Sequence, residues 1–277
     1  MKRLLIPVLV ICLLLSGCCF TLPWLDEPVL TPTPIQTDPS VTDTSEPPVE
    51  ETDPHVNDTE APQPEEKVTV YLVERTDYFD SGYVQYNYDN NYNILSYDVF
   101  SIENEPMFTS IFEEHNISGM PCKLTQFEEH WILSWFEDGK IREAQLEGTF
   151  TGYQYEYDLI GNLIQKRSYY EGILEETVCF EYNGDELLRM YCEDMDGNHI
   201  YDCRVENGLI IEKAYSQDFG GYSSFYEYDE NGNLINETGL YEGESIPVQI
   251  HTYIAVEVDA SRAQYLMEQQ KYLISVY

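Results

Sequence analysis

Pairs of tyrosines separated by one residue are the side chains in this sequence best suited to contact a ligand. Tyr153 and Tyr155 form one pair, and Tyr226 and Tyr228 form another. A period of two places each pair on one face of a β-strand. Aromatic rings stack on the apolar faces of sugars, so these four residues are the candidates for a carbohydrate-binding sheet face. Packing against neighbouring strands is the alternative, and aromatic cross-strand pairs contribute about 0.2–1 kcal/mol each.

Other residue patterns do not form a catalytic or metal-binding set. Glycoside hydrolases need two carboxyl groups at a set separation, and no pair stands out among 51 Asp and Glu residues. Residues 194–198 and 229–233 resemble calcium loops in composition, but they lack the glycine and glutamate spacing of an EF-hand. The sequence also has no HExxH zinc motif. We therefore predict a protein that is not an enzyme and holds no metal.

Four cysteines lie beyond residue 66, at positions 122, 179, 192 and 203. Export from the cytoplasm would permit disulfides. Cys192 and Cys203 flank the Asp196-Gly197 turn, and they could pair if the turn centres on Gly197 and Asn198. The alternative is that all four cysteines are small, buried, apolar side chains.

The amino terminus has the features of an export signal. Lys2 and Arg3 precede an apolar run, Leu4–Leu15, which is shorter than the roughly 20 residues that span a bilayer. Residues 15–18 read Leu-Ser-Gly-Cys and resemble the lipobox of bacterial lipoproteins. The resemblance implies removal of residues 1–17 by cleavage between Gly17 and Cys18, with a diacylglyceryl group and an added N-acyl chain on Cys18. Such an anchor holds a protein stably on a membrane.

Residues 18–66 predict a disordered acidic spacer rich in Pro and Thr. The stretch from Asp26 to Glu66 has 12 acidic residues and no Lys or Arg, so it cannot bury enough apolar surface to offset its ordering entropy. Residues 67–277 hold 39 acidic and 12 basic residues, so the predicted folded part is also acidic. The formal net charge of −37 argues against nucleic-acid binding and against attraction to anionic lipid.

Residues 67–277 repeat a pattern of alternating aromatics, an Asp or Asn, a Gly and an apolar residue. Asn-Gly and Asp-Gly supply the positive φ values of tight hairpin turns. The predicted turn residues are Asp138, Gly139, Asp158, Gly161, Asn183, Gly184, Asn207, Gly208, Asp229 and Gly232. With secondary turns between them, they leave strands of about six to nine residues. We predict an all-β fold, an antiparallel meander of short hairpin repeats in which each unit packs on its neighbours.

Two of these units share a longer motif. Residues 155–163 and 226–234 both read Tyr-x-Tyr-Asp-x-x-Gly-Asn-Leu. This motif resembles the YD, or RHS-type, repeat family, whose large members wind many repeats into a shell around a toxin. The resemblance covers roughly residues 83–245, and about five or six units are too few for a shell. It implies a β-strand architecture and a cell-surface or secreted setting.

Two regions depart from the repeat. Residues 101–131 are expected to be irregular, as an insertion or a capping segment. After a strand at 252–258, Asp259 is the predicted N-cap of a helix over 262–271. The predicted apolar stripe of this helix comprises Ala263, Leu266 and Met267, joined by Gln270 or Tyr265. We expect the stripe to cover the edge of the last strand, because a bare edge favours aggregation. Binding of a partner is the alternative role of this helix.

Together, these features predict a lipoprotein anchored on the extracytoplasmic face of the cell membrane. Its folded part is predicted to be a non-catalytic binding or structural module. The alternatives are a carbohydrate-binding lipoprotein that uses the tyrosine face, a polysaccharide hydrolase, and an immunity or accessory protein of a toxin. The expected partners are the lipid bilayer, through the anchor, and a glycan or a surface protein. The sequence leaves the ligand and the oligomeric state open.

Overall fold

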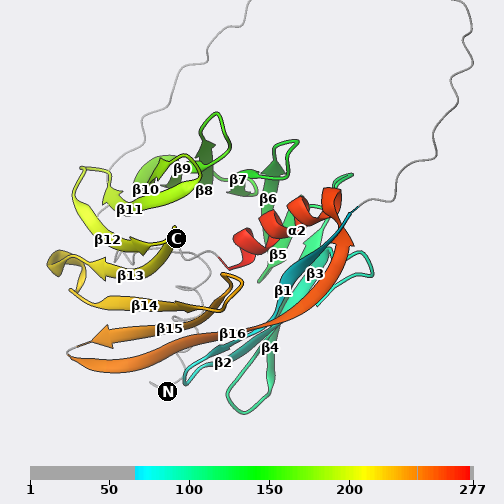
Figure 1. Ribbon diagram of the computed structural model, residues 1–277, viewed down its shortest axis with the longest axis horizontal. Coiled ribbons are helices and arrows are strands. Elements are labelled where there is room, and N and C mark those ends of the chain that lie inside the picture. The colour runs from blue at the N-terminus through cyan, green and yellow to red at the C-terminus, as the bar shows by residue number, and fades with distance from the viewer. Residues whose placement is uncertain (1–65, 242, 275–277) are drawn as a thin grey trace, which may run out of the picture. The chain divides into compact units, whose positions relative to one another are not determined.

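The computed structural model describes residues 66–241 and 243–274, which form an all-β domain with one C-terminal helix (Figure 1). Its sixteen strands differ in length from four to sixteen residues. They are β1 (Lys67–Tyr78), β2 (Gly82–Tyr88), β3 (Ile94–Phe100), β4 (Pro106–Glu113), β5 (Lys123–Gln126), β6 (Glu129–Trp135), β7 (Ile141–Leu146), β8 (Gly152–Tyr157), β9 (Leu163–Tyr170), β10 (Ile173–Asn183), β11 (Glu186–Asp194), β12 (His199–Glu206), β13 (Leu209–Tyr215), β14 (Ser223–Tyr228), β15 (Leu234–Tyr241) and β16 (Glu244–Asp259). A short 3₁₀ helix, η1 (Gln217–Phe219), precedes β14, and α2 (Ala260–Leu273) follows β16 directly.

Strands that follow one another along the chain pair with each other, and the sheet then closes into a barrel. The closing pair is β1 with β16, whose register runs from Lys67 opposite Asp259 to Tyr78 opposite Gln249. The strand order is that of the predicted meander, and the structure decides what the sequence had left open, which is whether the sheet stays flat, curls or closes. Strand twist accumulates across a long sheet and can bring its two ends together, and pairing them satisfies both free edges.

Four connections between strands have the same hydrogen bonds. They begin at Asp89, Asp158, Asp194 and Asp229 and end at an asparagine four residues later. In each turn the Asp carboxylate accepts two backbone N–H groups and the asparagine side chain, at 2.7–3.0 Å. The ten turn residues predicted from the sequence all lie in connections between strands or at strand ends.

The segment 101–131 is part of the barrel wall, so its assignment as an insertion or cap was wrong. It contains β4 and β5. Pro106 occupies the first position of β4, where its missing N–H is tolerated. In the β4–β5 loop, the side-chain oxygen of Asn116 accepts the N–H groups of Ser118 (2.9 Å) and Met120 (3.0 Å), as the aspartates do in the turns above.

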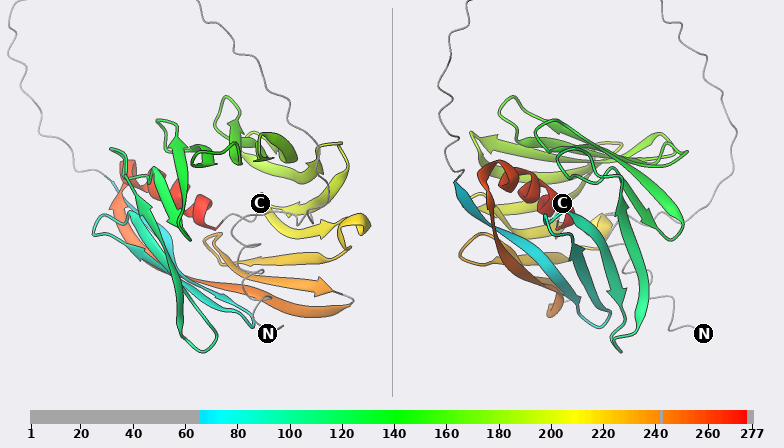
Figure 2. Two further views of the ribbon diagram at one scale, coloured as in Figure 1. Left: turned by 180° about the vertical axis from the view of Figure 1, so that it is seen from behind. Right: turned by 90° about the vertical axis from the view of Figure 1, so that its right-hand side faces the viewer.

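The helix α2 lies inside the curve of the sheet, at one end of the barrel (Figure 2). We call this end of the barrel the helix end. β1 begins at the helix end, and each connection that follows an even-numbered strand, such as β2–β3 or β4–β5, also lies there. The N–H of Ala260 donates to the Glu66 carbonyl (3.0 Å), and the Gln264 side chain donates to the Asp138 carbonyl (2.9 Å). Asp259 is the N-cap residue, but its carboxylate pairs with Lys67 (2.8 Å) and makes no cap hydrogen bond.

The face that α2 buries is more polar than predicted. Ala263 and Leu266 are buried against β1 and β16, whereas Met267 is 50% exposed. Gln269 is buried instead, together with Gln270, which was one of the two residues expected at the edge of the stripe. The helix was expected to cover the free edge of the last strand, β16, but β16 is already paired with β1 along that edge.

The two buried glutamines bond to the backbone of the barrel wall. Gln270 Oε1 accepts the N–H of Val73 (2.8 Å), beside a register shift in the β1–β16 pairing. Gln269 Oε1 accepts the N–H of Ile94 (3.1 Å), and its amide donates to the Tyr92 carbonyl (3.2 Å). These side chains therefore supply partners for buried backbone groups, which explains why amides replace apolar side chains here.

We predict that Gln270→Ala lowers the free energy of unfolding by about 1–3 kcal/mol, because it leaves the buried N–H of Val73 unpaired. Urea denaturation of the full chain measures this difference. Met267→Ala, at a half-exposed position of the same helix, is the control and should change stability by less than about 0.5 kcal/mol. Equal losses in the two variants would contradict the role assigned to Gln270.

Candidate functional site

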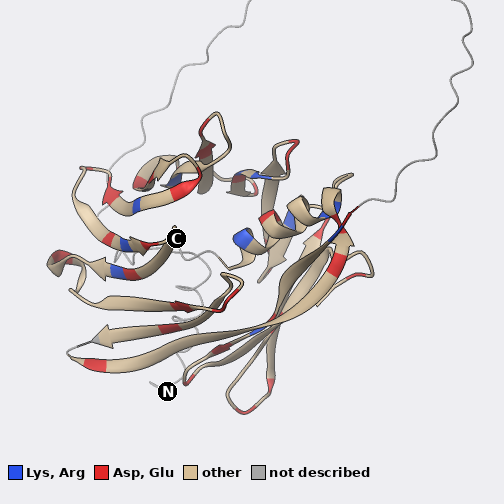
Figure 3. Ribbon diagram, viewed as in Figure 1, with Lys and Arg blue, Asp and Glu red and all other residues tan. Residues whose placement is uncertain are grey.

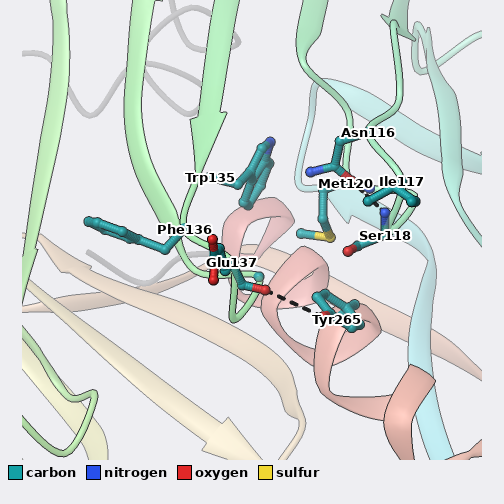
Figure 4. A pocket seen from close by; sticks show the side chains of 9 residues that line it. Asn116, Ile117, Ser118, Met120, Trp135, Phe136, Glu137 and Tyr265 are labelled. Atoms are coloured by element: carbon teal, nitrogen blue, oxygen red, sulfur yellow. Dashed lines mark hydrogen bonds between the residues drawn. The ribbon is translucent and has the colours of Figure 1, made fainter. Parts of the chain in front are cut away.

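A pocket of ≈ 290 Å³ lies at the helix end between α2 and two connections of the sheet (Figure 4). Figure 4 shows Trp135, Met120 and Tyr265 around this space, while Phe136 points away from them. The β4–β5 loop and the β6–β7 turn supply most of its lining: Asn116, Ile117, Ser118, Met120, Trp135, Phe136, Glu137 and Gly139. Tyr265 of α2 completes it.

The aromatic side chains of the pocket are held by the surrounding structure. Trp135 Nε1 donates to the Pro121 carbonyl (2.6 Å), and its ring meets Tyr272 of α2 edge-on at 5.9 Å. The Tyr265 hydroxyl donates to the Glu137 carbonyl (3.4 Å). Its ring lies against Gly139, where an added Cβ would come within 2.6 Å of a ring carbon. Gly139 also has φ +85°, so both the space and the backbone conformation require glycine.

Three aromatic side chains and a thioether line the pocket, together with an amide, two hydroxyls and a carboxylate. Its volume lies just below the roughly 300–1,000 Å³ typical of ligand pockets, so it fits one small ring. Across residues 66–241 and 243–274, no group of three or more His, Cys, Asp and Glu side chains is placed to hold a metal ion. The arrangement is suited to holding a small polar ligand that has an apolar face.

The four tyrosines predicted as a ligand face lie on two separate parts of the wall, in β8 and β14. Tyr226 is only 6% exposed and Tyr228 packs against the same core cluster, so neither forms an open platform. Tyr153 is half-buried, stacks with Trp131 (6.1 Å between ring centres) and has the ammonium of Lys166 5.0 Å from its ring centre. Tyr155 lies opposite Lys166 across the β8–β9 pair. Ligand binding by these rings stays a prediction.

The second tyrosine of each Tyr-x-Tyr-Asp unit has a structural contact that the sequence analysis missed. The hydroxyls of Tyr88, Tyr157 and Tyr228 donate to a backbone carbonyl on the preceding strand, at 2.7, 3.0 and 2.8 Å. The acceptors are the carbonyls of Val73, Ile141 and Ile210. Each bond fastens two strands near the helix end, whereas their connecting turn lies at the opposite end. This contact gives a physical reason for tyrosine at that position of the repeat.

The interior face of the wall also holds charged side chains that were not singled out from the sequence. Lys213 Nζ lies 4.8 Å from the centre of the Tyr201 ring, and burial lowers the pKa of Lys213. Burial raises the pKa of Glu176, whose carboxylate accepts the Cys192 thiol at 3.9 Å. Both shifts favour the neutral forms, as expected for charges moved out of water. For Glu176, the period of two with the buried Val178 and Phe180 was the available sequence signal. Lys213 had no such signal, because the buried residue of its strand, Ile210, is three positions away.

The suggested pairing of Cys192 with Cys203 is not formed. Cys192 lies opposite Tyr201, and Cys203 lies opposite Met190. The turn between β11 and β12 runs from Asp194 to Asn198 and so centres on Asp196, not on Gly197 and Asn198. All four cysteines of the described part are free thiols, and burial raises the pKa of Cys203 to about 11.

His251 is a buried titratable group beside the interior wall. Its Nδ1 lies 2.8 Å from the Thr76 hydroxyl, and its Nε2 has no hydrogen-bond partner within residues 66–241 and 243–274. Burial lowers the pKa of His251 to about 4. The folded chain thus holds this imidazole neutral well below the pKa of about 6.5 that it has when exposed.

We predict that this histidine makes folding sensitive to mild acid. Between pH 7 and pH 5 the unfolded chain gains a proton on His251 that the folded chain does not, so stability falls as pH falls, by about 2 kcal/mol. The urea concentration at the unfolding midpoint should therefore decrease from pH 7 to pH 5, and most of this slope against pH should be lost in His251→Gln. His199→Gln, at a side chain that is 45% exposed, should retain the slope, and a slope unchanged in His251→Gln would refute the assignment.

Cys18 and Gly17, the predicted lipidation and cleavage residues, lie outside the described residues. Within the described part, no helix is both long and apolar enough to cross a membrane.

Comparisons with known proteins show no family for this chain. No protein-family model matches it, and no curated protein matches it. A porin-like protein from Bacteroides uniformis is similar in structure, with 13% identity and a TM-score of 0.46 over 70% of this chain and 98% of that one. The Photorhabdus luminescens Tc holotoxin pore matches 61% of this chain at 12% identity, with a TM-score of 0.31. A TcdB2-TccC3 complex matches 66% of this chain at 7% identity, with a TM-score of 0.26. This chain spans only 12% and 14% of those two.

Proposed function

We propose that this chain is a lipid-anchored, extracytoplasmic binding protein whose barrel holds a small carbohydrate in the pocket at the helix end. The observation that supports this most directly is the placing of Trp135 and Tyr265 beside Asn116, Ser118 and Glu137. Aromatic rings take the apolar face of a sugar, and amide, hydroxyl and carboxylate groups bond to its hydroxyls. The repeats that resemble YD units agree with a surface setting, and the signal-like amino terminus supports export.

The pocket is better placed for this role than the tyrosines selected from the sequence. Tyr226 is buried in a core cluster and the Tyr228 hydroxyl is bonded to the backbone, so exposing either would cost folding energy. Tyr265, in contrast, lies on α2 at the edge of the wall, with its ring facing the pocket (Figure 4). A ligand could therefore reach it without opening the barrel.

We predict that the chain without residues 1–18 binds at least one member of a glycan panel saturably. Gly139→Ala should weaken that binding about tenfold or more, because the added methyl displaces the Tyr265 ring. Gly232→Ala is the matched control, since its φ of +81° gives the same backbone strain but nothing lies within 4 Å of the added Cβ. It should leave affinity unchanged.

Two results would contradict this assignment. Absence of any saturable glycan binding would remove the carbohydrate role. Binding that survives Gly139→Ala and Trp135→Ala but is lost in Tyr153→Ala would move the ligand to the interior tyrosines.

We also predict that Cys18 carries the lipid. Cells fed a labelled fatty acid should label the full chain, and the label and the membrane-bound fraction should both be lost in Cys18→Ser. Cys19→Ser, one residue further on, is the control and should keep both. If the label is retained in Cys18→Ser, or is lost equally in both variants, the assignment of Cys18 as the lipidated residue is refuted.

A further inference from the structure

The pocket at the helix end is lined by a single charged side chain, the carboxylate of Glu137. None of its other lining residues is Lys, Arg or His. Among residues 66–241 and 243–274, this carboxylate has no hydrogen bond and no ion pair; the contact that Glu137 makes with Tyr265 is through its backbone carbonyl. The pocket therefore carries a negative charge that the surrounding side chains leave unbalanced.

Two basic side chains lie close to the pocket, and both are bound to other acceptors. The ammonium of Lys140 pairs with the carboxylate of Asp138, so its charge is already balanced. The guanidinium of Arg262 donates to the Ser118 carbonyl and to the side-chain oxygen of Asn93. Neither basic group forms an ion pair with the carboxylate of the pocket, so a ligand is left to supply the positive charge.

The aromatic part of the lining also favours a positive ligand. A cation within about 6 Å of the centre of an aromatic ring is attracted by the electrons of the ring, and Trp attracts it most strongly. Trp135, Tyr265 and the thioether of Met120 lie around the pocket (Figure 4). Because the Tyr265 hydroxyl donates to the Glu137 carbonyl (3.4 Å), a ring and the unbalanced carboxylate belong to residues in direct contact. Aromatic rings beside a carboxylate are suited to an ammonium group.

The charge of the whole domain acts in the same direction. Residues 67–277 hold 39 acidic and 12 basic residues. Acidic side chains are spread along the strands and turns, with few basic ones between them (Figure 3). Such a surface raises the local concentration of cations and repels anions. Sugars that carry carboxylate, sulfate or phosphate groups are therefore poor candidates for the pocket.

We propose that the ligand of this pocket is an amino sugar whose amine is free and protonated. The proposal rests on the proposed function for the carbohydrate, and it adds the charge that the carbohydrate carries. The sugar ring packs on Trp135 and Tyr265, and its ammonium group donates to the carboxylate of Glu137. The amide of Asn116 and the hydroxyl of Ser118 remain for the sugar hydroxyls. A quaternary ammonium ion fits the rings, but it has no N–H or O–H to offer these polar groups.

The proposal predicts that the pocket discriminates against the acetylated form of the same sugar. Acetylation removes the positive charge, so the attraction to the rings and to the carboxylate is lost. It also adds bulk to a ligand in a pocket of ≈ 290 Å³, which fits one small ring. A sugar with a hydroxyl in place of the amine keeps its size but lacks the charge.

The test is calorimetric titration of the chain without residues 1–18 in a slightly acidic, low-salt buffer. The probes are the methyl glycosides of glucosamine, N-acetylglucosamine and glucose, and the same three forms of galactose. We expect the amine form of at least one sugar to bind about tenfold or more tightly than its acetylated and hydroxyl forms. Added salt should reduce this ratio, because it screens the attraction between charges.

Glu137→Gln should remove the preference for the amine form and leave binding of the two neutral forms unchanged. Glu230→Gln is the matched control, because Glu230 is an exposed carboxylate in the β14–β15 turn at the same end of the barrel, outside the pocket lining. It changes the net charge by the same amount and should retain the preference. Both positions are exposed, so we expect both variants to fold.

Three outcomes would overturn the proposal while leaving the carbohydrate role intact. One is equal affinity for the three forms of every sugar that binds. Another is tighter binding of an acetylated form. The third is equal loss of the preference in Glu137→Gln and Glu230→Gln, which would assign it to the overall charge of the domain. Absence of binding by every form would instead remove the carbohydrate role itself, and this proposal with it.

Discussion

The backbone pairing of β1 with β16 is the contact on which the rest of this structure depends. It joins segments about 180 residues apart in sequence and turns a meander with two free edges into a closed wall. Because α2 follows β16 without a loop, the same pairing delivers the helix to the start of β1. Gln270 can then reach Val73, where the register of the two strands shifts. Closure and helix docking therefore support each other.

The candidate site is a consequence of that closure. Its lining comes from β4–β5, β6–β7 and α2, and no local stretch of chain could assemble it. Tyr265 reaches Gly139 only when the end of the chain has returned to the wall built from its first half. Long-range contacts of this kind cost loop-closure entropy before they contribute stability, so the pocket should form late in folding.

The side chains at the helix end differ in how they are held. The rings of Trp135 and Tyr265 are held by hydrogen bonds and packing, as a binding site requires. The side chains of Leu159 and Ile160, in contrast, are exposed to solvent. Inside the barrel, burial shifts the pKa values of Lys213 and Glu176 so that the neutral form of each is favoured.

Local chemistry determined much of this protein. Alternating tyrosines and the Asp-Gly and Asn-Gly turns are short-range signals, and they specified an all-β chain of hairpins because each acts within a few residues. The terminal helix begins after Asp259 as predicted, although the Asp259 carboxylate makes no cap hydrogen bond. Closure of the sheet, the use of 101–131 as β4 and β5, and the burial of Gln269 in place of Met267 could not be predicted in this way. Each depends on which distant backbone groups remain unpaired once the wall is built, and only the tertiary structure decides that.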